Sequence, residues 1–133
     1  MRILLIEDNT DHIFLARQAV DRVWGQATLH IAHDPDEARA RYCQPGRSLR
    51  FDVLLVSLDA RDANRLLRLR QMQECLELTS APIIALASST RDQELAQVAH
   101  QPVDWIILKP LRAEALLQAL QRRPLETYRP AQA

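Results

Sequence analysis

The chain has few residues of several kinds that mark common functional sites. Among its 133 residues are two glycines, two cysteines and one lysine. Gly25 and Gly46 lie too far apart to form either common glycine-rich phosphate loop. No apolar run approaches the ~18 residues that a membrane span needs. Residues 1–6 are too short for the apolar region of a signal peptide, and acidic residues follow at once. We expect a soluble, cytoplasmic protein.

Neither sign of charge predominates in the composition. The 17 acidic residues balance 17 basic ones, so no overall field attracts nucleic acid or a membrane surface. The length fits about one domain. Cys43 and Cys75 lie outside any metal-binding or redox spacing, and each falls on a helix-like segment. We expect each to be a buried, small hydrophobic residue.

The segment from Phe51 to Ser57 is the one around which the chain is organised. Val53–Val56 is an unbroken apolar run, which is typical of a strand buried on both faces inside a parallel sheet. Four further segments have strand character. In residues 27–32, apolar and polar residues alternate, as they do in a half-exposed edge strand. The predicted strands are residues 2–7, 27–32, 51–57, 82–87 and 103–108.

Helical periodicity separates these strands. Cap residues near Asn9 open a first helix that Gly25 ends, and Asp34 with Pro35 opens a second. Thr90 and Gln93 form a capping-box pattern before a fourth helix. The predicted buried stripes are Ile13, Ala16, Val20 and Val23 in the first helix; Leu66, Leu69, Met72 and Leu76 in the third; Leu95, Val98 and Ala99 in the fourth; Ala113, Leu116, Leu117 and Leu120 in the fifth. Five strand–helix units predict an α/β domain with a parallel sheet covered on both faces.

Polar residues follow the predicted strands at their carboxyl ends, where open parallel sheets carry their sites. The edge residues are Glu7 and Asp8 after the first strand, Ser57 and Asp59 at the third, Ala87 and Ser88 at the fourth, and Lys109 at the fifth. Acids, hydroxyls and one amine at a single edge suggest a site for a hard cation and an anion, with Mg²⁺ the natural cation. Since strand side chains alternate, Ser88 should point away from Ser57 if the strand extends that far; we expect it to begin the following loop.

Four pieces, in this order and spacing, resemble the response-regulator receiver domain of two-component signalling. They are residues 3–9 with the acidic pair, residues 51–56, residues 82–86, and residues 107–110 with Lys109 and Pro110. The resemblance covers residues 1–122 and leaves 123–133 as a short tail. It implies a single-domain, flavodoxin-like (βα)₅ sheet in the order 2-1-3-4-5. It also implies that Lys109 is the phosphate-site lysine, and that the bond before Pro110 is cis as in the family.

The chain departs from the family pattern where the chemistry should occur. The acceptor position, normally Asp, is Ser57. The switch position, normally Thr or Ser, is Ala87, and the usual aromatic residue is Ile106. A serine hydroxyl is a weak nucleophile without an adjacent base. Losing one of three carboxylates should also weaken Mg²⁺ binding by Glu7, Asp8 and Asp59.

These departures predict a stand-alone, receiver-like interaction module that acts without phosphorylation, is not an enzyme and requires no cofactor. Glu7, Asp8 and Lys109 would then form an ion-paired cluster, with Lys109 bound to one of the acids. The expected partner is a histidine kinase, a phosphotransfer protein or an output protein. We expect recognition, and potentially homodimerisation, through the fourth helix, fifth strand and fifth helix.

Two alternatives stay open. The chain could be a response regulator phosphorylated with Mg²⁺ on Asp59 or Ser57. A small α/β phosphotransferase or hydrolase fits less well, because the acidic motif after the third strand lacks a partner nucleophile. Arg61, Arg65 and Arg68 share one helical face, which is usually solvated and less often binds an acidic partner. Trp24 and Trp105 are interpreted as packing residues.

Overall fold

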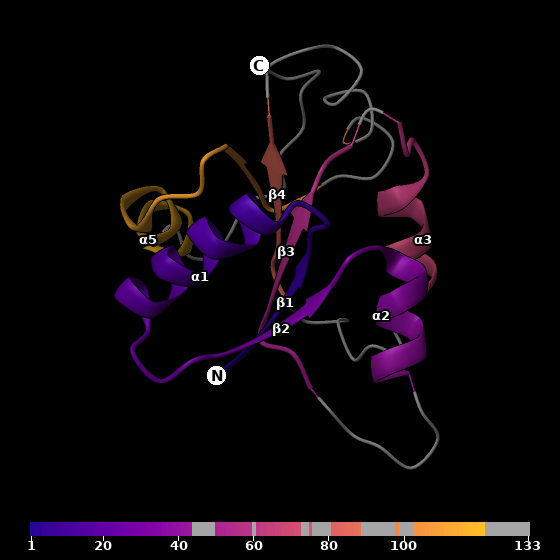
Figure 1. Ribbon diagram of the computed structural model, residues 1–133, viewed down its shortest axis with the longest axis horizontal. Helices are drawn as coiled ribbons and strands as arrows, with labels where there is room; N and C mark the ends of the chain where they lie inside the picture. The colour runs from indigo at the N-terminus through magenta and orange to yellow at the C-terminus, as the bar shows by residue number, and fades with distance from the viewer. Residues whose placement is uncertain are drawn as a thin grey trace.

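Parallel strands and helices alternate along the chain (Figure 1). The computed structural model describes residues 1–43, 50–59, 61–72, 75, 81–88, 98 and 103–121. The elements within these ranges are β1 (Arg2–Ile6), α1 (Thr10–Val23), β2 (Thr28–Ala32), α2 (Pro35–Tyr42), β3 (Val53–Ser57), α3 (Arg65–Gln71), β4 (Ile83–Ala87), β5 (Trp105–Leu108) and α5 (Ala113–Gln121).

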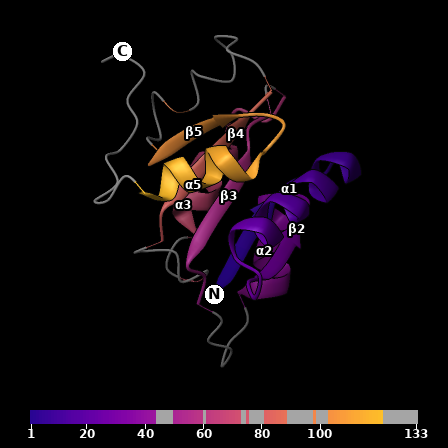
Figure 2. The ribbon, with the colours of Figure 1, turned by 90° about the vertical axis from the view of Figure 1, so that its left-hand side faces the viewer.

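The five strands form one sheet in the order β2-β1-β3-β4-β5, and every neighbouring pair is parallel. The order predicted from the resemblance is therefore confirmed. All five residues of β3 are buried, as its unbroken apolar sequence predicts. Figures 1 and 2 show α1 and α5 on one face of the sheet and α2 and α3 on the other.

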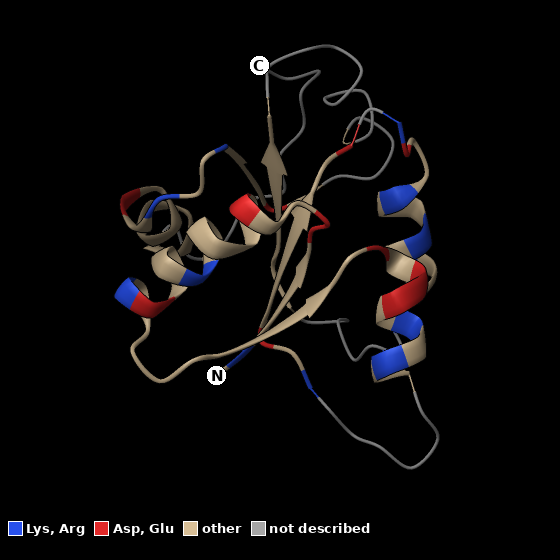
Figure 3. Cartoon of the chain, viewed as in Figure 1, with Lys and Arg blue, Asp and Glu red and all other residues tan. Residues whose placement is uncertain are grey.

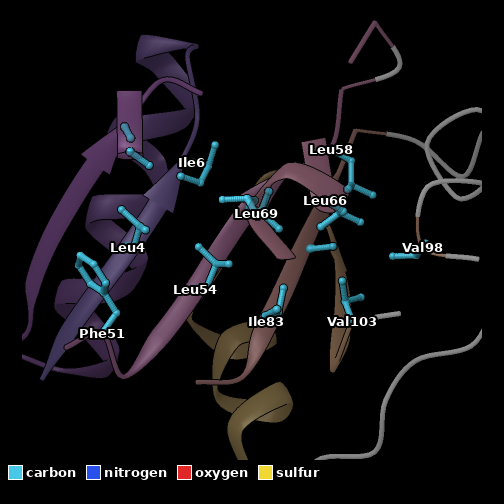
Figure 4. Packing of buried hydrophobic residues seen from close by; sticks show 14 of the residues in the cluster. Leu4, Ile6, Phe51, Leu54, Leu58, Leu66, Leu69, Ile83, Val98 and Val103 are labelled. Atoms are coloured by element: carbon cyan, nitrogen blue, oxygen red, sulfur yellow. The ribbon is translucent and has the colours of Figure 1, made fainter. Parts of the chain in front are cut away.

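Each face of the sheet carries its own hydrophobic cluster. Alternate strand residues such as Leu4, Leu54 and Ile83 pack beneath α2 and α3, where Leu66 and Leu69 cover them (Figure 4). The intervening strand residues pack with α1 and α5. No helix within the described residues is long and apolar enough to cross a membrane.

Capping residues place two helices where the sequence predicts them. The Asn9 side chain accepts hydrogen bonds from the backbone N–H groups of Asp11 and His12, at 2.9 and 3.1 Å, and so begins α1. The Asp34 side chain accepts one from the Glu37 N–H at 2.8 Å, directly before the proline that opens α2. As a result, α1 begins at Thr10, close behind the acidic pair that follows β1.

Several element boundaries differ from those predicted. β3 begins at Val53, two residues later than predicted, and Phe51 instead packs edge-on against the rings of His30 and Tyr42. β5 begins at Trp105, although Val103 before it is buried. Apolar character thus marks buried chain beyond the hydrogen-bonded strands. Leu76 and most of the predicted fourth helix lie outside the described residues; Val98, which is described, is buried as predicted.

The stripe predicted for α5 is wrong at one position. Leu117 is 42% exposed, whereas Leu116 and Ala119 are buried. Both leucines suit the helical period, but the sheet covers only a narrow arc of the helix. Ala119, which was not part of the predicted stripe, is buried, and Leu117, which was, is exposed.

The prediction for the two cysteines is also wrong. Cys43 and Cys75 form a disulfide with their Cα atoms 5.3 Å apart, and Cys75 is exposed. Cys43 caps the end of α2, and Cys75 lies four residues beyond the end of α3. These helices lie side by side on one face of the sheet (Figures 1 and 3). The sequence separation of 32 residues carries no sign of this proximity.

Candidate functional site

Three polar side chains meet at the carboxyl edge of the sheet because of strand alternation. Glu7, Ser57 and Lys109 continue the rows of β1, β3 and β5 residues that face α1 and α5. Backbone hydrogen bonds extend the sheet by one residue here, from the Glu7 N–H to the Ala32 carbonyl at 2.9 Å and from the Lys109 N–H to the Ala87 carbonyl at 2.8 Å. The site residues are thus held on rigid backbone rather than on loops.

The Lys109 ammonium is the centre of this cluster. It donates a hydrogen bond to Glu7 Oε1 at 2.6 Å and one to Ser57 Oγ at 2.6 Å. His12 Nδ1 lies 3.0 Å from the same nitrogen. The predicted pairing of Lys109 with one of the two acids is confirmed, with Glu7 as the partner. The peptide bond between Lys109 and Pro110 is cis, as the resemblance implies.

Glu7 is a buried carboxylate with both oxygens bound. Its side chain is 3% exposed, Oε1 faces Lys109, and Oε2 accepts hydrogen bonds from the N–H groups of Asp8 and Asn9 at 3.0 and 3.2 Å. Burial disfavours the charge and raises the pKa of this carboxyl, but the Lys109 ammonium, the Asn9 N–H and the Ser57 hydroxyl together lower it below its ordinary value. Glu7 is therefore ionised and compensated.

His12 belongs to the cluster, although the sequence analysis assigned no role to any histidine. Its Nδ1 also lies 3.3 Å from Glu7 Oε1. An ammonium can only donate, so His12 accepts from Lys109 in the tautomer that leaves Nδ1 without a proton. The available signal was its place on the first turn of α1, because a helix that begins after β1 starts at the same edge of the sheet as the site.

Asp59 and Asp8 lie near a second cation. Arg61 donates to both Asp59 carboxylate oxygens, at 3.1 Å through Nε and 3.0 Å through Nη2. These hydrogen bonds outweigh burial and lower the pKa of the Asp59 carboxyl. The pKa of the Arg61 guanidinium is raised, by Asp59 first and also by Asp8. Asp8 itself is exposed.

Arg65 approaches Ser57 from the opposite face of the sheet. It is 4% exposed, and its Nη1 donates to the Ser57 carbonyl at 2.9 Å. Its Nε donates to Asp62 at 3.3 Å, and Arg68 binds the same Asp62 oxygen at 2.5 Å. The expectation of a solvated arginine face is therefore wrong for Arg65. The helical face predicted for the three arginines is also wrong for Arg61, because α3 begins only at Arg65.

The two degenerate switch positions point away from this cluster. Ala87 is fully buried and Ile106 is half-buried, and both pack on the α2–α3 side of the sheet. β4 ends at Ala87, so Ser88 falls beyond the strand and is exposed. The cavity beside Lys109, Glu7 and His12 is only about 10 Å³. That volume is no larger than a single water molecule needs.

The carboxylates of Glu7 and Asp59 are engaged inside the protein and are not arranged around a position for Mg²⁺. Within the described ranges, no group of three or more His, Cys, Asp or Glu residues is arranged to hold a metal ion. Both Glu7 oxygens are hydrogen-bonded inside the protein, and both Asp59 oxygens are bound by Arg61. These hydrogen bonds leave the two carboxylates less capacity to coordinate a hard cation. Lys109 and Arg61 instead supply the positive charge near these acids.

Comparison with known proteins gives one curated relative. The chain is 30% identical over 124 residues to the probable methanogenesis regulatory protein FilR2 of Methanothrix harundinacea (strain 6Ac). The match covers 90% of this chain and 78% of that protein. No protein-family model matches the chain.

Solved structures share the fold at lower sequence identity. A two-component response regulator from Legionella pneumophila superposes with a TM-score of 0.73 at 14% identity, covering 91% of this chain and 95% of that one. The bacteriophytochrome response regulator AtBRR superposes with a TM-score of 0.71 at 23% identity, covering 94% and 93%. These identities establish the common fold and leave the chemistry to be argued from the residues.

Proposed function

This chain belongs to the response-regulator receiver family, and on that premise we propose that it is a receiver-like interaction module of two-component signalling that acts without phosphorylation. The observation that carries the proposal is the complete use of the Lys109 ammonium. An ammonium has three N–H donors. Glu7, Ser57 and His12 each lie within 3.0 Å of Lys109 Nζ.

A phosphoryl group would have to displace one of these contacts. Its oxygens would need a donor from Lys109, whose ammonium already contacts Glu7, Ser57 and His12. Breaking the Glu7 contact would leave a buried carboxylate uncompensated, which is costly. The filled site supports a single resting arrangement.

The candidate acceptors are poor nucleophiles in this arrangement. Ser57 is 3% exposed, and its oxygen accepts a hydrogen bond from the Lys109 cation. The base beside the hydroxyl is the Glu7 carboxylate, but it is a weak one, because its pKa is lowered and Lys109 already binds it. The Asp59 carboxylate is held by Arg61, which lowers its pKa and its nucleophilicity. Neither residue is prepared to take a phosphoryl group.

The positions that would transmit a phosphorylation signal also lack the required groups. Ala87 has no hydroxyl and Ile106 has no ring to reorient. A ligand shifts an equilibrium only through contacts that differ between the two states. The absence of all three contact groups at Ser57, Ala87 and Ile106 supports a fixed binding surface. We propose no enzymatic activity and no required cofactor, with at most weak Mg²⁺ binding.

The β5–α5 face is the proposed binding surface. Leu108 at the end of β5 is 53% exposed and Leu117 on α5 is 42% exposed, so this face presents apolar area. We propose that a histidine kinase, a phosphotransfer protein or an output protein binds here in the cytoplasm, and that a homodimer could use the same face. The predicted fourth helix, which would complete the surface, lies outside the described residues.

Phosphoryl labelling tests the proposal directly. The protein is incubated with acetyl phosphate and Mg²⁺, and its intact mass is measured over time. We expect no added phosphoryl group. The matched control is Ser57→Asp under the same conditions, which should gain one because it restores the acceptor carboxylate. Stoichiometric labelling of the unaltered protein at Ser57 or Asp59 would overturn the proposal in favour of a phosphorylated regulator.

A second experiment tests the surface. Leu117→Arg is compared with Leu67→Arg, since Leu67 on α3 is similarly exposed at 38% and lies on the other face of the sheet. Partner binding or self-association, measured by sedimentation, should weaken only for Leu117→Arg. Equal effects of both substitutions would exclude the β5–α5 face.

A further inference from the structure

The Cys43–Cys75 disulfide is a surface link between two helices. Cys43 caps the C-terminal end of α2, and Cys75 follows α3. Cys75 is exposed, whereas Cys43 is half-buried. Cys75 also lines an open groove of about 380 Å³ together with Arg39 and Arg68. The bond is therefore open to attack at the Cys75 sulfur.

We propose that Cys43–Cys75 is a reversible thiol–disulfide modification site, and that its redox state is the input that regulates this protein. The idea rests on the proposed function in one respect: a receiver that takes no phosphate needs a different input. Disulfides in the reducing cytoplasm, where we place the protein, are usually transient and redox-sensing rather than structural.

The reductant is a protein dithiol, which exchanges with the Cys43–Cys75 disulfide in two steps. One thiolate of the dithiol attacks Cys75 Sγ, a mixed disulfide forms, and the bond to Cys43 breaks. Cys43 leaves as a thiolate and takes a proton from water. The second thiol of the dithiol then resolves the mixed disulfide and releases Cys75. In total, two electrons and two protons reach the cysteines and the dithiol becomes a disulfide. Arg39 and Arg68 favour the approach of the attacking thiolate through their charge.

Reduction should loosen the C-terminal end of α3, because the other links to α2 among the described residues are apolar packing and an exposed ion pair. The helix has only seven residues, which is too short for stability without tertiary contacts. The ion pair of Arg68 with Asp36 joins the two helices at 3.1 Å, but Asp36 is 77% exposed and such pairs contribute little. The charged residues of α2 and α3 lie side by side in Figure 3.

The same helix reaches the candidate site. Arg65, at its first turn, donates to the Ser57 carbonyl, and Arg68 shares Asp62 with it. A helix that moves at its C-terminal end transmits the change through these bonds to the end of β3. The two states that the redox input selects are a helix bound covalently to α2 and one held only by packing and ion pairs.

Hydrogen–deuterium exchange of the full chain tests this inference. Exchange over residues 61–72 is measured in the oxidised protein, in protein reduced with dithiothreitol, and in Cys43→Ser/Cys75→Ser, with circular dichroism confirming that each is folded. We expect reduction to raise the exchange rate in this segment by roughly tenfold or more, and the double variant to match the reduced protein. Residues 10–23 of α1 should not change.

Unchanged exchange in residues 61–72 after reduction would overturn the inference. So would a disulfide in the folded protein that dithiothreitol does not reduce. In cells quenched with acid and alkylated, both thiol and disulfide forms should be found, and diamide should shift the population to the disulfide. Cysteines that stay thiols under diamide would also contradict it. Phosphoryl labelling can fail or succeed independently, so the two proposals are separable.

Discussion

Two cations hold Ser57 from opposite faces of the sheet, and they do so differently. Lys109 donates to the side-chain oxygen, while Arg65 donates to the carbonyl oxygen. On the Lys109 side the anion is Glu7, whose side chain is 3% exposed. On the Arg65 side it is Asp62, which is 22% exposed and has Arg68 as a second partner. Lys109 compensates the buried Glu7 carboxylate without a second cation, whereas Arg65 shares Asp62 with Arg68.

The difference lies in how much of each side the family resemblance covers. On the Lys109 side are residues that the resemblance assigns to a phosphoryl-binding site, and internal contacts satisfy them. The Arg65 side has no counterpart in the motifs that identify the family, yet it fixes the same residue. Together they constrain both the side chain and the backbone of Ser57, so the position is rigid whether or not it reacts.

The largest effect should come from Lys109→Met. The substitution leaves the Glu7 carboxylate buried without its cation, and we expect a loss of about 4 kcal/mol in the free energy of unfolding. Urea denaturation measures it. Glu7→Gln/Lys109→Met is the matched control and should recover most of the loss, because the uncompensated charge is removed. A single variant as stable as the double would show that the pair contributes little.

Removal of the disulfide should rank next. The link closes a loop with a separation of 32 residues, for which the chain-entropy estimate is about 3 to 4 kcal/mol. We expect Cys43→Ser/Cys75→Ser to unfold at lower urea than the oxidised protein and at the same urea as the reduced one. If reduction left the midpoint unchanged, the link would not constrain the folded chain.

Arg65→Met should cost less than Lys109→Met. It leaves the Ser57 carbonyl without its donor but leaves Asp62 paired with Arg68, so we expect a loss of about 2 kcal/mol. The same denaturation series makes the comparison. A cost that exceeds that of Lys109→Met would reverse the assignment of Glu7 as the charge that depends on a single cation.

The smallest effect concerns pH. Because the folded pKa of the Glu7 carboxyl lies below its ordinary value of 4.5, stability from this group is complete above pH 4.5 and is lost as the pH falls below it. Burial and then Arg2 lower the pKa of His30 from 6.5, so its contribution fades as the pH falls below about 6.5. Urea midpoints between pH 7.5 and 4 measure both.

Two variants separate these contributions. Glu7→Gln should remove the decline below pH 4.5, and His30→Phe should remove the one that begins near 6.5. His30 suits this test because its Nε2 is buried with no hydrogen-bond partner within the described part of the chain. A pH profile that neither variant changes would assign the acid sensitivity to other groups.

Much of the fold follows from local sequence. The apolar run Val53–Val56 predicted a buried strand, and Asn9 and Asp34 open helices where their caps predict. The strand order came from the family resemblance, because periodicity does not specify neighbours in a sheet. Leu117 was misplaced because the helical period does not give the width of the buried arc. The disulfide was missed because contacts between α2 and α3 depend on tertiary structure.

The candidate site, like the fold, was predicted from the sequence only in part. Glu7, Ser57 and Lys109 were predicted together, since parallel strands bring their carboxyl ends to one edge. A pair between Lys109 and either Glu7 or Asp8 was expected from the cost of burying an unpaired charge, and the structure identifies Glu7 as the partner. His12 and Arg65 enter from helices, and their approach depends on how α1 and α3 are oriented over the sheet. That orientation is set by packing between residues far apart in the chain.

The placement of the aromatic residues gives the protein two separate optical reporters. Trp24 and Trp105 both pack in the cluster beneath α1 and α5, whereas Tyr42 packs with Phe51 and His30 beneath α2. Tryptophan emission therefore senses events on the Lys109 side, and near-ultraviolet signals of Tyr42 sense the side that carries the disulfide. A titration followed at both wavelengths would show on which face of the sheet a bound partner or an oxidant acts first.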